Sequence, residues 1–155
     1  MLLLCLVNGG LGGAIQRLTH DNLSATCTSL EEAWGWTRND RILHVLPLHH
    51  NHGLINKLCC PLWVGASTEL LDAWSPASVW AAFLREPDAE DALTVFMATP
   101  TIYAKLYEHY QSVISKTMNM EEVRRRCSSQ RVMVSGSSEF YTCSRSIAGS
   151  ALSSE

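Results

Sequence analysis

Short apolar segments that alternate with stretches of helical periodicity constrain the fold of this chain more than any other feature. The apolar segments span residues 42–47 (ILHVLP), 68–72 (TELLD), 94–98 (TVFMA) and 131–134 (RVMV), and each has the length of a buried strand. Strands separated by helices are joined by crossover connections, which place them in parallel. We therefore predict an α/β fold with a largely parallel sheet and crossover helices.

The stretches between these segments carry helix signals. A helix over residues 21–36 is predicted by apolar side chains at helical spacing, namely Leu23, Cys27, Leu30 and Trp34. Residues 53–64 have a similar character and end near a glycine. A hydroxyl residue followed by proline predicts two helix starts, at residues 75–76 and 99–100, because the first can cap free N–H groups and the second fits the first turn. A further helix is predicted over residues 120–127.

Composition and charge exclude several classes of protein. The chain is 46% hydrophobic and 17% charged, which is typical of a globular protein. Its net charge is −3 and its longest basic block is residues 124–126, so a nucleic-acid partner is not expected. No apolar run approaches the roughly 20 residues of a membrane-spanning helix. The six cysteines form no CxxC pair, which favours buried free thiols over a disulfide framework.

The two ends differ from the central pattern. The N-terminal MLLLCLV is apolar like a signal peptide, but it lacks a basic start and glycines follow it, so an apolar strand or a stray leader is the favoured interpretation. The run NGGLGG at residues 8–13 lacks the Lys-Ser/Thr ending of a phosphate loop and is interpreted as a flexible segment. Residues 138–155 are serine-rich without an apolar face and predict a frayed tail.

A histidine-rich turn follows the first predicted strand. The sequence PLHHNHG places His49, His50 and His52 where α/β proteins commonly bind ligands, beyond the carboxyl end of a strand. Imidazole groups bind zinc or copper, but no nearby cysteine or carboxylate completes a four-ligand set. Three interpretations stay open: a metal site, a pocket lining with one functional histidine, and ordinary loop histidines.

Two more strand ends carry residues suited to an anion or a nucleotide. ATPTIYAKL joins a strand to a helix whose first N–H groups are unpaired, and it places Lys105 one turn into that helix, where an isolated lysine is usually a solvated surface residue. VSGS, at residues 134–137, puts a glycine and two serines directly after a strand, so that a ligand can approach the backbone closely. Each signal is weak by itself.

Taken in order, five segments resemble the adenylate-forming superfamily of acyl-CoA synthetases. They are LTHDNL, ILHVLPLHHNHG, CPLWVGA, FMATPTIYAKL and VMVSGS. Within the superfamily, the sequences PLHHNHG, KLCCPLWVGAS and MATPTIYAKLYEHY most resemble the malonyl-CoA synthetase type of animal mitochondria. The resemblance covers about residues 18–137. It implies a part of the large N-terminal adenylation domain, an ATP- and magnesium-dependent ligase that makes an acyl-adenylate, and coenzyme A as the acceptor of the acyl group.

The resemblance also implies roles for residues of this chain. His50, with His49 as the alternative, would line the acyl pocket. Lys105 would face the distal carboxylate of malonate, where bacterial relatives use arginine, and Gly136 and Ser137 would border the adenine and the acyl group. Thr99 and Thr101 belong to the turn that precedes Lys105 and are included among the substrate-binding candidates. A malonate-like carboxylate is thus the implied small-molecule partner, and mitochondria are the implied compartment, although the sequence shows no transit peptide.

The sequence departs from the family pattern on both sides of this region. GGAIQR stands where the family's phosphate loop, rich in Ser, Thr and Gly and ending in Lys-Gly, is expected, and SEFYTCS follows VSGS in place of Ala-Pro-Leu. The family's magnesium-linked glutamate, ribose-binding aspartate and C-terminal lysine have no counterpart. We therefore expect a divergent leader (residues 1–17), a partial AMP-binding domain (18–137) and a divergent serine-rich tail (138–155), with no catalytic or metal-binding residue assigned.

Three functions compete at this stage. The first is a malonyl-CoA-synthetase-type ligase by descent that is inactive as this chain. The second is a noncatalytic protein that binds an acyl group or a partner, and the third is a metal-binding module built on the three histidines. Exchange of pyrophosphate into ATP would favour the first, saturable binding without exchange the second, and stoichiometric zinc the third.

Overall fold

A four-stranded parallel sheet forms the centre of the molecule. The computed structural model describes residues 4–8, 14–71 and 73–136, and for residues 4–8 and 14–17 it describes the backbone alone. The strands are β3 (Arg41–His44), β4 (Ser67–Leu70), β5 (Val95–Ala98) and β6 (Val132–Ser135), in the order β4-β3-β5-β6. All three neighbouring pairs are parallel. The predicted α/β class and parallel sheet are confirmed.

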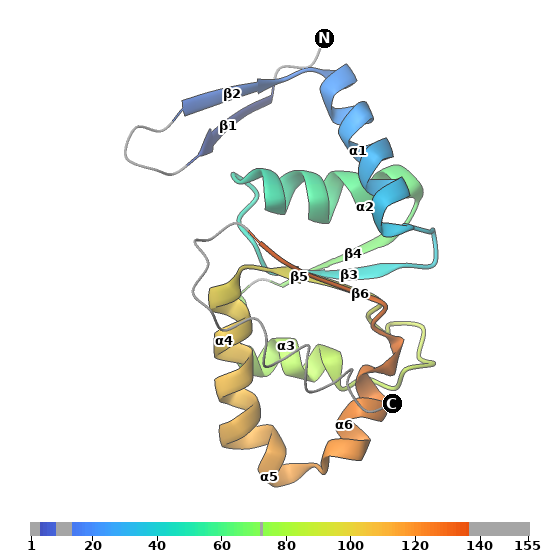
Figure 1. The fold of residues 1–155 in the computed structure, drawn as a ribbon, viewed down its shortest axis with the longest axis vertical. Coiled ribbons are helices and arrows are strands. Elements are labelled where there is room, and N and C mark those ends of the chain that lie inside the picture. The colour runs from blue at the N-terminus through green and yellow to red at the C-terminus, as the bar shows by residue number, and fades with distance from the viewer. Residues whose placement is uncertain (1–3, 9–13, 72, 137–155) are drawn as a thin grey trace.

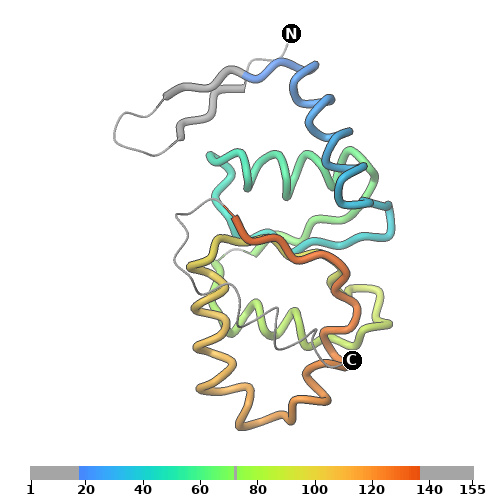
Figure 2. The backbone as a smooth tube through the Cα atoms, in the orientation of Figure 1, coloured from blue at the N-terminus to red at the C-terminus, as the bar shows by residue number. Residues whose placement is uncertain are grey.

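Helices cover both faces of this sheet (Figure 1). On one face lie α1 (His20–Trp34), the π-helix η1 (His52–Cys59) and α2 (Cys60–Val64). On the other lie α3 (Pro76–Phe83) and α4 (Pro100–His109). The chain then continues through η2 (Tyr110–Ile114), α5 (Ser115–Thr117), α6 (Met120–Arg126) and the 3-10 turn η3 (Cys127–Ser129). Figure 2 shows this last segment turning back toward the sheet to enter β6.

Of the two helix starts predicted from a hydroxyl residue before proline, both begin a helix, but only Ser75 caps it with its side chain. Ser75 accepts a hydrogen bond from the Ser78 backbone N–H while the Ser78 side chain bonds back to Ser75, and Pro76 occupies the first turn of α3. Thr19 and Asn22 form the same reciprocal pair at the start of α1. Gly35 ends α1 in the left-handed conformation, at φ 58°, which glycine adopts without a steric penalty.

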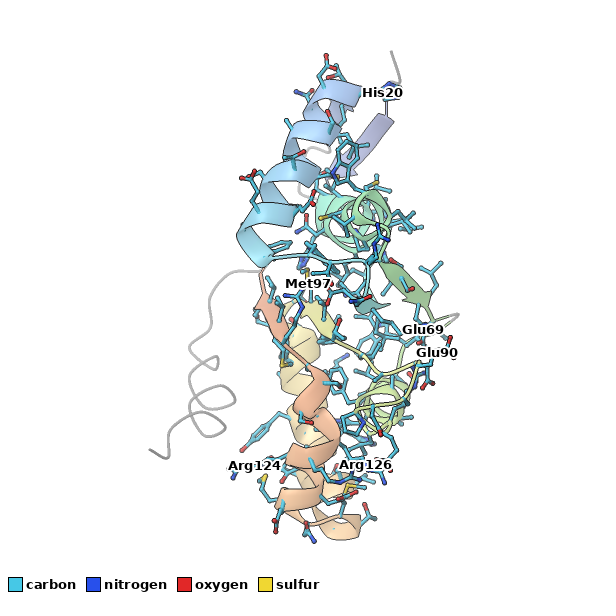
Figure 3. All side chains as sticks on the ribbon, turned by 90° about the vertical axis from the view of Figure 1, so that its right-hand side faces the viewer. His20, Glu69, Glu90, Met97, Arg124 and Arg126 are labelled. Carbon is cyan, nitrogen blue, oxygen red and sulfur yellow. The ribbon has the colours of Figure 1, made fainter. Side chains whose placement is uncertain are left out.

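The two faces of the sheet bury separate apolar cores. Leu43, Val45 and Phe96 point toward α3 and α4, where they meet Val79, Phe83, Ile102 and Leu106. Ile42, Val95 and Met97 point to the opposite side, where they meet Cys27, Ile55 and Cys60. Figure 3 shows Met97 in the interior between the layers. The alternation along β3 and β5 explains why these strands appear in the sequence as continuous apolar runs.

A buried aspartate joins the amino ends of the strands. Asp40 is 3% exposed and accepts hydrogen bonds from the Thr37 backbone at 2.7 Å, the Thr94 hydroxyl at 2.7 Å and Arg131 Nε at 2.8 Å. Burial opposes ionisation of Asp40, but these bonds outweigh that effect and lower the pKa of its carboxyl group. Since Thr94 and Arg131 precede β5 and β6, one carboxylate holds three strand starts together.

Some sequence expectations differ in detail from the structure. Residues 53–64, predicted as one helix, form the π-helix η1 followed by α2, because Pro61 has no N–H to continue the hydrogen-bond ladder. Within the glycine-broken leader, β1 (Leu4–Asn8) pairs antiparallel with β2 (Ala14–Leu18), which agrees with an apolar strand at the N-terminus. The glycines of NGGLGG at residues 9–13, and the tail at 138–155, lie outside the described residues.

Candidate functional site

The carboxyl ends of the strands gather the predicted site segments at one edge of the sheet. Because β3, β5 and β6 run in parallel, the loops that follow them emerge together. The histidine turn follows β3, the Thr-Pro-Thr turn follows β5, and Gly136 follows β6. All three loops therefore lie at one edge of the sheet, while Ser137 lies outside the described residues.

Close backbone contacts fix the histidine turn. The His50 N–H donates to the Pro47 carbonyl at 3.3 Å, and the His50 carbonyl accepts from Leu54 at 2.9 Å. At Gly53, an added Cβ would lie 2.2 Å from the Pro47 carbonyl oxygen, so no larger residue fits without moving the backbone. The His44 ring nitrogen Nε2 is hydrogen-bonded to the Gly53 carbonyl oxygen at 2.9 Å. The turn is therefore packed against the strand that precedes it.

The three histidines of the turn do not converge. The rings of His49 and His50 lie 4.4 Å apart between centroids, with His49 exposed and His50 half-buried. His52, by contrast, is buried at the start of η1. Among the residues that the structure describes, no three His, Cys, Asp or Glu side chains are grouped to hold a metal ion. His49 and His50 are thus the members of the turn that a ligand at this edge can reach.

A buried basic cluster lies beneath the turn and was not predicted from the sequence. Lys57 is fully buried, donates to the Leu43 carbonyl at 3.2 Å, and has its Nζ 5.2 Å from the centroid of the Phe96 ring. Burial lowers its pKa to about 7. Burial also lowers the pKa values of His44 and His52, and the nearby Lys57 charge adds to both effects. The available signal was the position of Lys57, four residues after Gly53 and three before Cys60, on the buried side of the helix.

The loops after β5 and β6 are joined directly. The Gly136 N–H donates to the Ala98 carbonyl at 3.2 Å, which brings Gly136 next to the start of the Thr-Pro-Thr turn. The Tyr103 hydroxyl donates to the Val134 carbonyl at 3.1 Å, and burial raises the pKa of this phenol. Thr99 has an extended backbone and its side chain caps no N–H group, and Thr101 is exposed. Pro100 has no N–H, and the Ile102 and Tyr103 N–H groups donate to the Thr99 carbonyl at 3.0 and 3.2 Å, so the first turn of α4 offers fewer free N–H groups than the sequence predicted.

Lys105 extends from α4 toward the segment between β4 and α3. Its Nζ lies 5.5 Å from the centroid of the Trp74 ring. Trp74 also lines a cavity of about 390 Å³ beyond the ends of β3 and β4, together with Leu46, Leu48, Leu70 and Leu71. Trp74 therefore links the cavity to a nearby cation, at the same edge of the sheet as the histidine turn. That His49 or His50, the Thr99–Thr101 turn and Gly136–Ser137 border one common pocket stays a prediction.

Comparison with known proteins places this architecture in context. The family model described as "AMP-binding enzyme" matches residues 17–143. The mitochondrial malonate–CoA ligase ACSF3 of Mus musculus is 49% identical over 120 residues, which cover 77% of this chain and 20% of the relative. The malonate–CoA ligase of Arabidopsis thaliana is 34% identical over 125 residues, again covering 77% of this chain and 20% of the relative. The chain thus spans about a fifth of the length of these relatives.

Solved structures give the same picture. ATP-bound MatB from Rhodopseudomonas palustris superimposes with a TM-score of 0.68 at 27% identity, covering 86% of this chain and 24% of that protein. A malonyl-CoA ligase with methylmalonyl-CoA and AMP bound superimposes with a TM-score of 0.66 at 27% identity, over 86% of this chain and 27% of that protein. No helix in the described part of the chain is long and apolar enough to cross a membrane.

Proposed function

The chain belongs to the AMP-binding enzyme family, and from this premise we propose that it carries the malonate-binding edge of an ATP-dependent acid–thiol ligase. Such a ligase activates a carboxylic acid as its acyl-adenylate and transfers the acyl group to coenzyme A. The observation that carries the proposal is the Lys105 ammonium beside the cavity at the carboxyl edge of the sheet. The names of the relatives, which specify malonate, support the choice of acid.

The proposed binding mode follows from the chemistry of malonate. Malonate has two carboxylates, of which one reacts and one must be recognised. Lys105 pairs with the distal carboxylate, and His50, or His49 beside it, borders the reacting end. A lysine supplies charge and three donors but lacks the two-pronged geometry of arginine, so malonate is held less rigidly than an arginine would hold it.

ATP, magnesium and coenzyme A are the cosubstrates and metal that the family implies. We assign Thr99, Thr101, Gly136 and Ser137 to the border of the nucleotide and acyl group, because hydroxyl side chains can donate to phosphate oxygens and glycine allows a ligand to approach the backbone closely. ATP would supply the adenylate group that activates the carboxylate. No described residues form a three-ligand metal group, and we assign no residue of this chain to magnesium.

A second candidate function is noncatalytic binding of a short acid. It is favoured by the distribution of charged groups: Lys105 stands at the acid-binding edge, whereas GGAIQR offers Arg17 as its single cation for phosphate. A chain of this kind would bind malonate without turning it over. Mitochondrial location is part of the proposal, since the animal relatives are named as mitochondrial proteins.

Calorimetric titration of the purified chain tests the acid-binding edge. We expect malonate to bind more tightly than propionate, which has a similar size but no second carboxylate, and we expect Lys105→Ala to remove the difference. Lys116→Ala, in α5 and so outside the site segments, is the matched control for loss of a lysine. Equal affinities for the two acids in the wild-type chain would contradict the proposed function.

A further inference from the structure

The Lys105 side chain has an aromatic partner from another segment. Trp74 lies between β4 and α3, is half-buried, and packs against the core that covers the α3 and α4 face. Its ring lies 5.5 Å from Lys105 Nζ, within the range of a cation–π contact. Among the described residues, no carboxylate forms an ion pair with Lys105. The indole is therefore the group that determines where this ammonium stands.

A cation–π contact suits a lysine whose ammonium must stay available to bind the carboxylate of a ligand. The contact engages one side of the ammonium and leaves its N–H groups free to donate. An exposed contact of this kind contributes about 0.5–1 kcal/mol, enough to reduce the motion of a long side chain but weaker than a buried ion pair. A carboxylate partner would instead neutralise the charge that an incoming acid needs. Trp74 thus contacts the Lys105 ammonium while leaving its N–H donors available to a ligand.

The same indole borders the cavity. Trp74 lines it with Leu46, Leu48, Leu70 and Leu71, so the same residue neighbours both a largely apolar cavity and the Lys105 ammonium. This combination fits a short acid with a carboxylate to meet the ammonium and little polar surface elsewhere. Resting on the proposed function, we propose that Trp74 is the positioning residue of the acid-binding site: it holds Lys105 at the cavity rim and so determines the preference for an acid with a second carboxylate.

The test compares three variants of the full chain. Trp74→Leu keeps an apolar side chain but removes the aromatic face, Trp74→Phe keeps a face, and Lys105→Met removes the charge. We expect Trp74→Leu to weaken malonate binding about two- to five-fold, the fold-change that corresponds to an exposed cation–π contact. Because Trp74 also lines the cavity, its replacement affects packing around both acids, so the readout is the ratio of malonate to propionate affinity, which should fall by this factor. Trp74→Phe should recover most of the malonate affinity, and Trp74→Leu should have no further effect on malonate in the Lys105→Met background.

A second measurement reports the contact without any ligand. In the wild-type chain, NMR should show the Lys105 methylene protons shifted upfield by the indole ring, assigned by their loss in Lys105→Met. Trp74→Leu should abolish the shift while leaving the backbone spectrum elsewhere unchanged, which separates positioning from a folding defect.

The outcomes distinguish this inference from the function on which it rests. Unchanged malonate affinity in Trp74→Leu, with the preference lost in Lys105→Met, overturns the role of Trp74 and leaves the proposed function standing. A wild-type chain that binds no malonate contradicts the proposed function, and the Lys105 shift then decides separately whether Trp74 positions the lysine. Absence of that shift overturns the positioning itself.

Discussion

Gly53 has the closest backbone contact of the glycines in the described part of the chain. Its replacement by alanine would put a methyl carbon 2.2 Å from the Pro47 oxygen and 2.9 Å from the Pro47 carbonyl carbon, both backbone atoms that cannot move independently of the histidine turn. We expect Gly53→Ala to lower the free energy of unfolding by roughly 1–3 kcal/mol, the usual cost of overpacking. Urea denaturation measures it. Gly136→Ala is the control, because nothing lies within 4 Å of the added carbon, and equal losses in both variants would contradict the explanation.

Lys57 makes stability depend on pH in a predictable direction. Its pKa is about 7 in the folded chain and near 10.5 when unfolded, so between these values the unfolded chain binds the extra proton and stability rises with pH. The folded state carries the full cost of the buried charge below about pH 7 and loses it as pH rises. Each pKa unit corresponds to about 1.4 kcal/mol.

Lys57→Met should therefore stabilise the chain most near pH 7 and least near pH 10. Denaturation of both proteins at pH 7.5, 8.5 and 9.5 checks this, in a range where His44 and His52, whose pKa values are lowered from 6.5, are neutral in both. A difference between the two proteins that does not change with pH would show that Lys57 does not titrate there.

At the scale of elements, much of the fold could be predicted because the signals are local. The apolar runs of β3 and β5, the Ser75-Pro76 start of α3 and the Thr99-Pro100 start of α4 depend on neighbouring residues alone. The Lys105–Trp74 contact depends on residues brought together by the fold, so no spacing in the sequence indicates it. The burial of Lys57 had one local signal, its helical spacing from Gly53 and Cys60, but its partner Leu43 comes from another element. The helix predicted over residues 53–64 is present as one uninterrupted helical stretch that ends at Gly65, but its change from the π-helix η1 to α2 was not predicted.

Asp40 provides the test of how the strand starts are held together. Asp40→Asn keeps the size of the side chain but removes the charge that accepts from Arg131 and the Thr94 hydroxyl. We expect a loss of roughly 1.5–3 kcal/mol in the free energy of unfolding, the usual contribution of a hydrogen bond to a charged group. Hydrogen exchange should rise at the amino ends of β5 and β6. Glu121→Gln, an exposed carboxylate in α6 with no ion pair among the described residues, is the control.

At the scale of the whole molecule, the proposed acid-binding edge and the segment in the phosphate-loop position are different parts of the chain. His50 and Gly136 lie on loops at the carboxyl edge of the sheet and Lys105 lies on α4, which starts at that edge, whereas the segment that stands in the phosphate-loop position is GGAIQR. Charge on a transferring phosphoryl group must be met by cations and donors that are held in place. Arg17 is the one cation in that segment. If the proposed function is right, malonate binding and malonate activation depend on different parts of the chain, and an experiment can separate them.

We predict that the purified chain forms no measurable malonyl-CoA with ATP, magnesium, malonate and coenzyme A. Loss of one preorganised donor typically costs on the order of 100–1,000-fold in rate, and several are missing in the phosphate-loop position, although such losses are not additive. A coupled assay of pyrophosphate release measures the activity, with a chimera that restores the family's phosphate loop and C-terminal half as the positive control. Malonate should still bind, because attraction of its distal carboxylate to Lys105 does not require ATP. Turnover by this chain that is lost in Lys105→Ala would show that the acid-binding edge and the phosphate-handling groups are both complete here, and the prediction would be wrong.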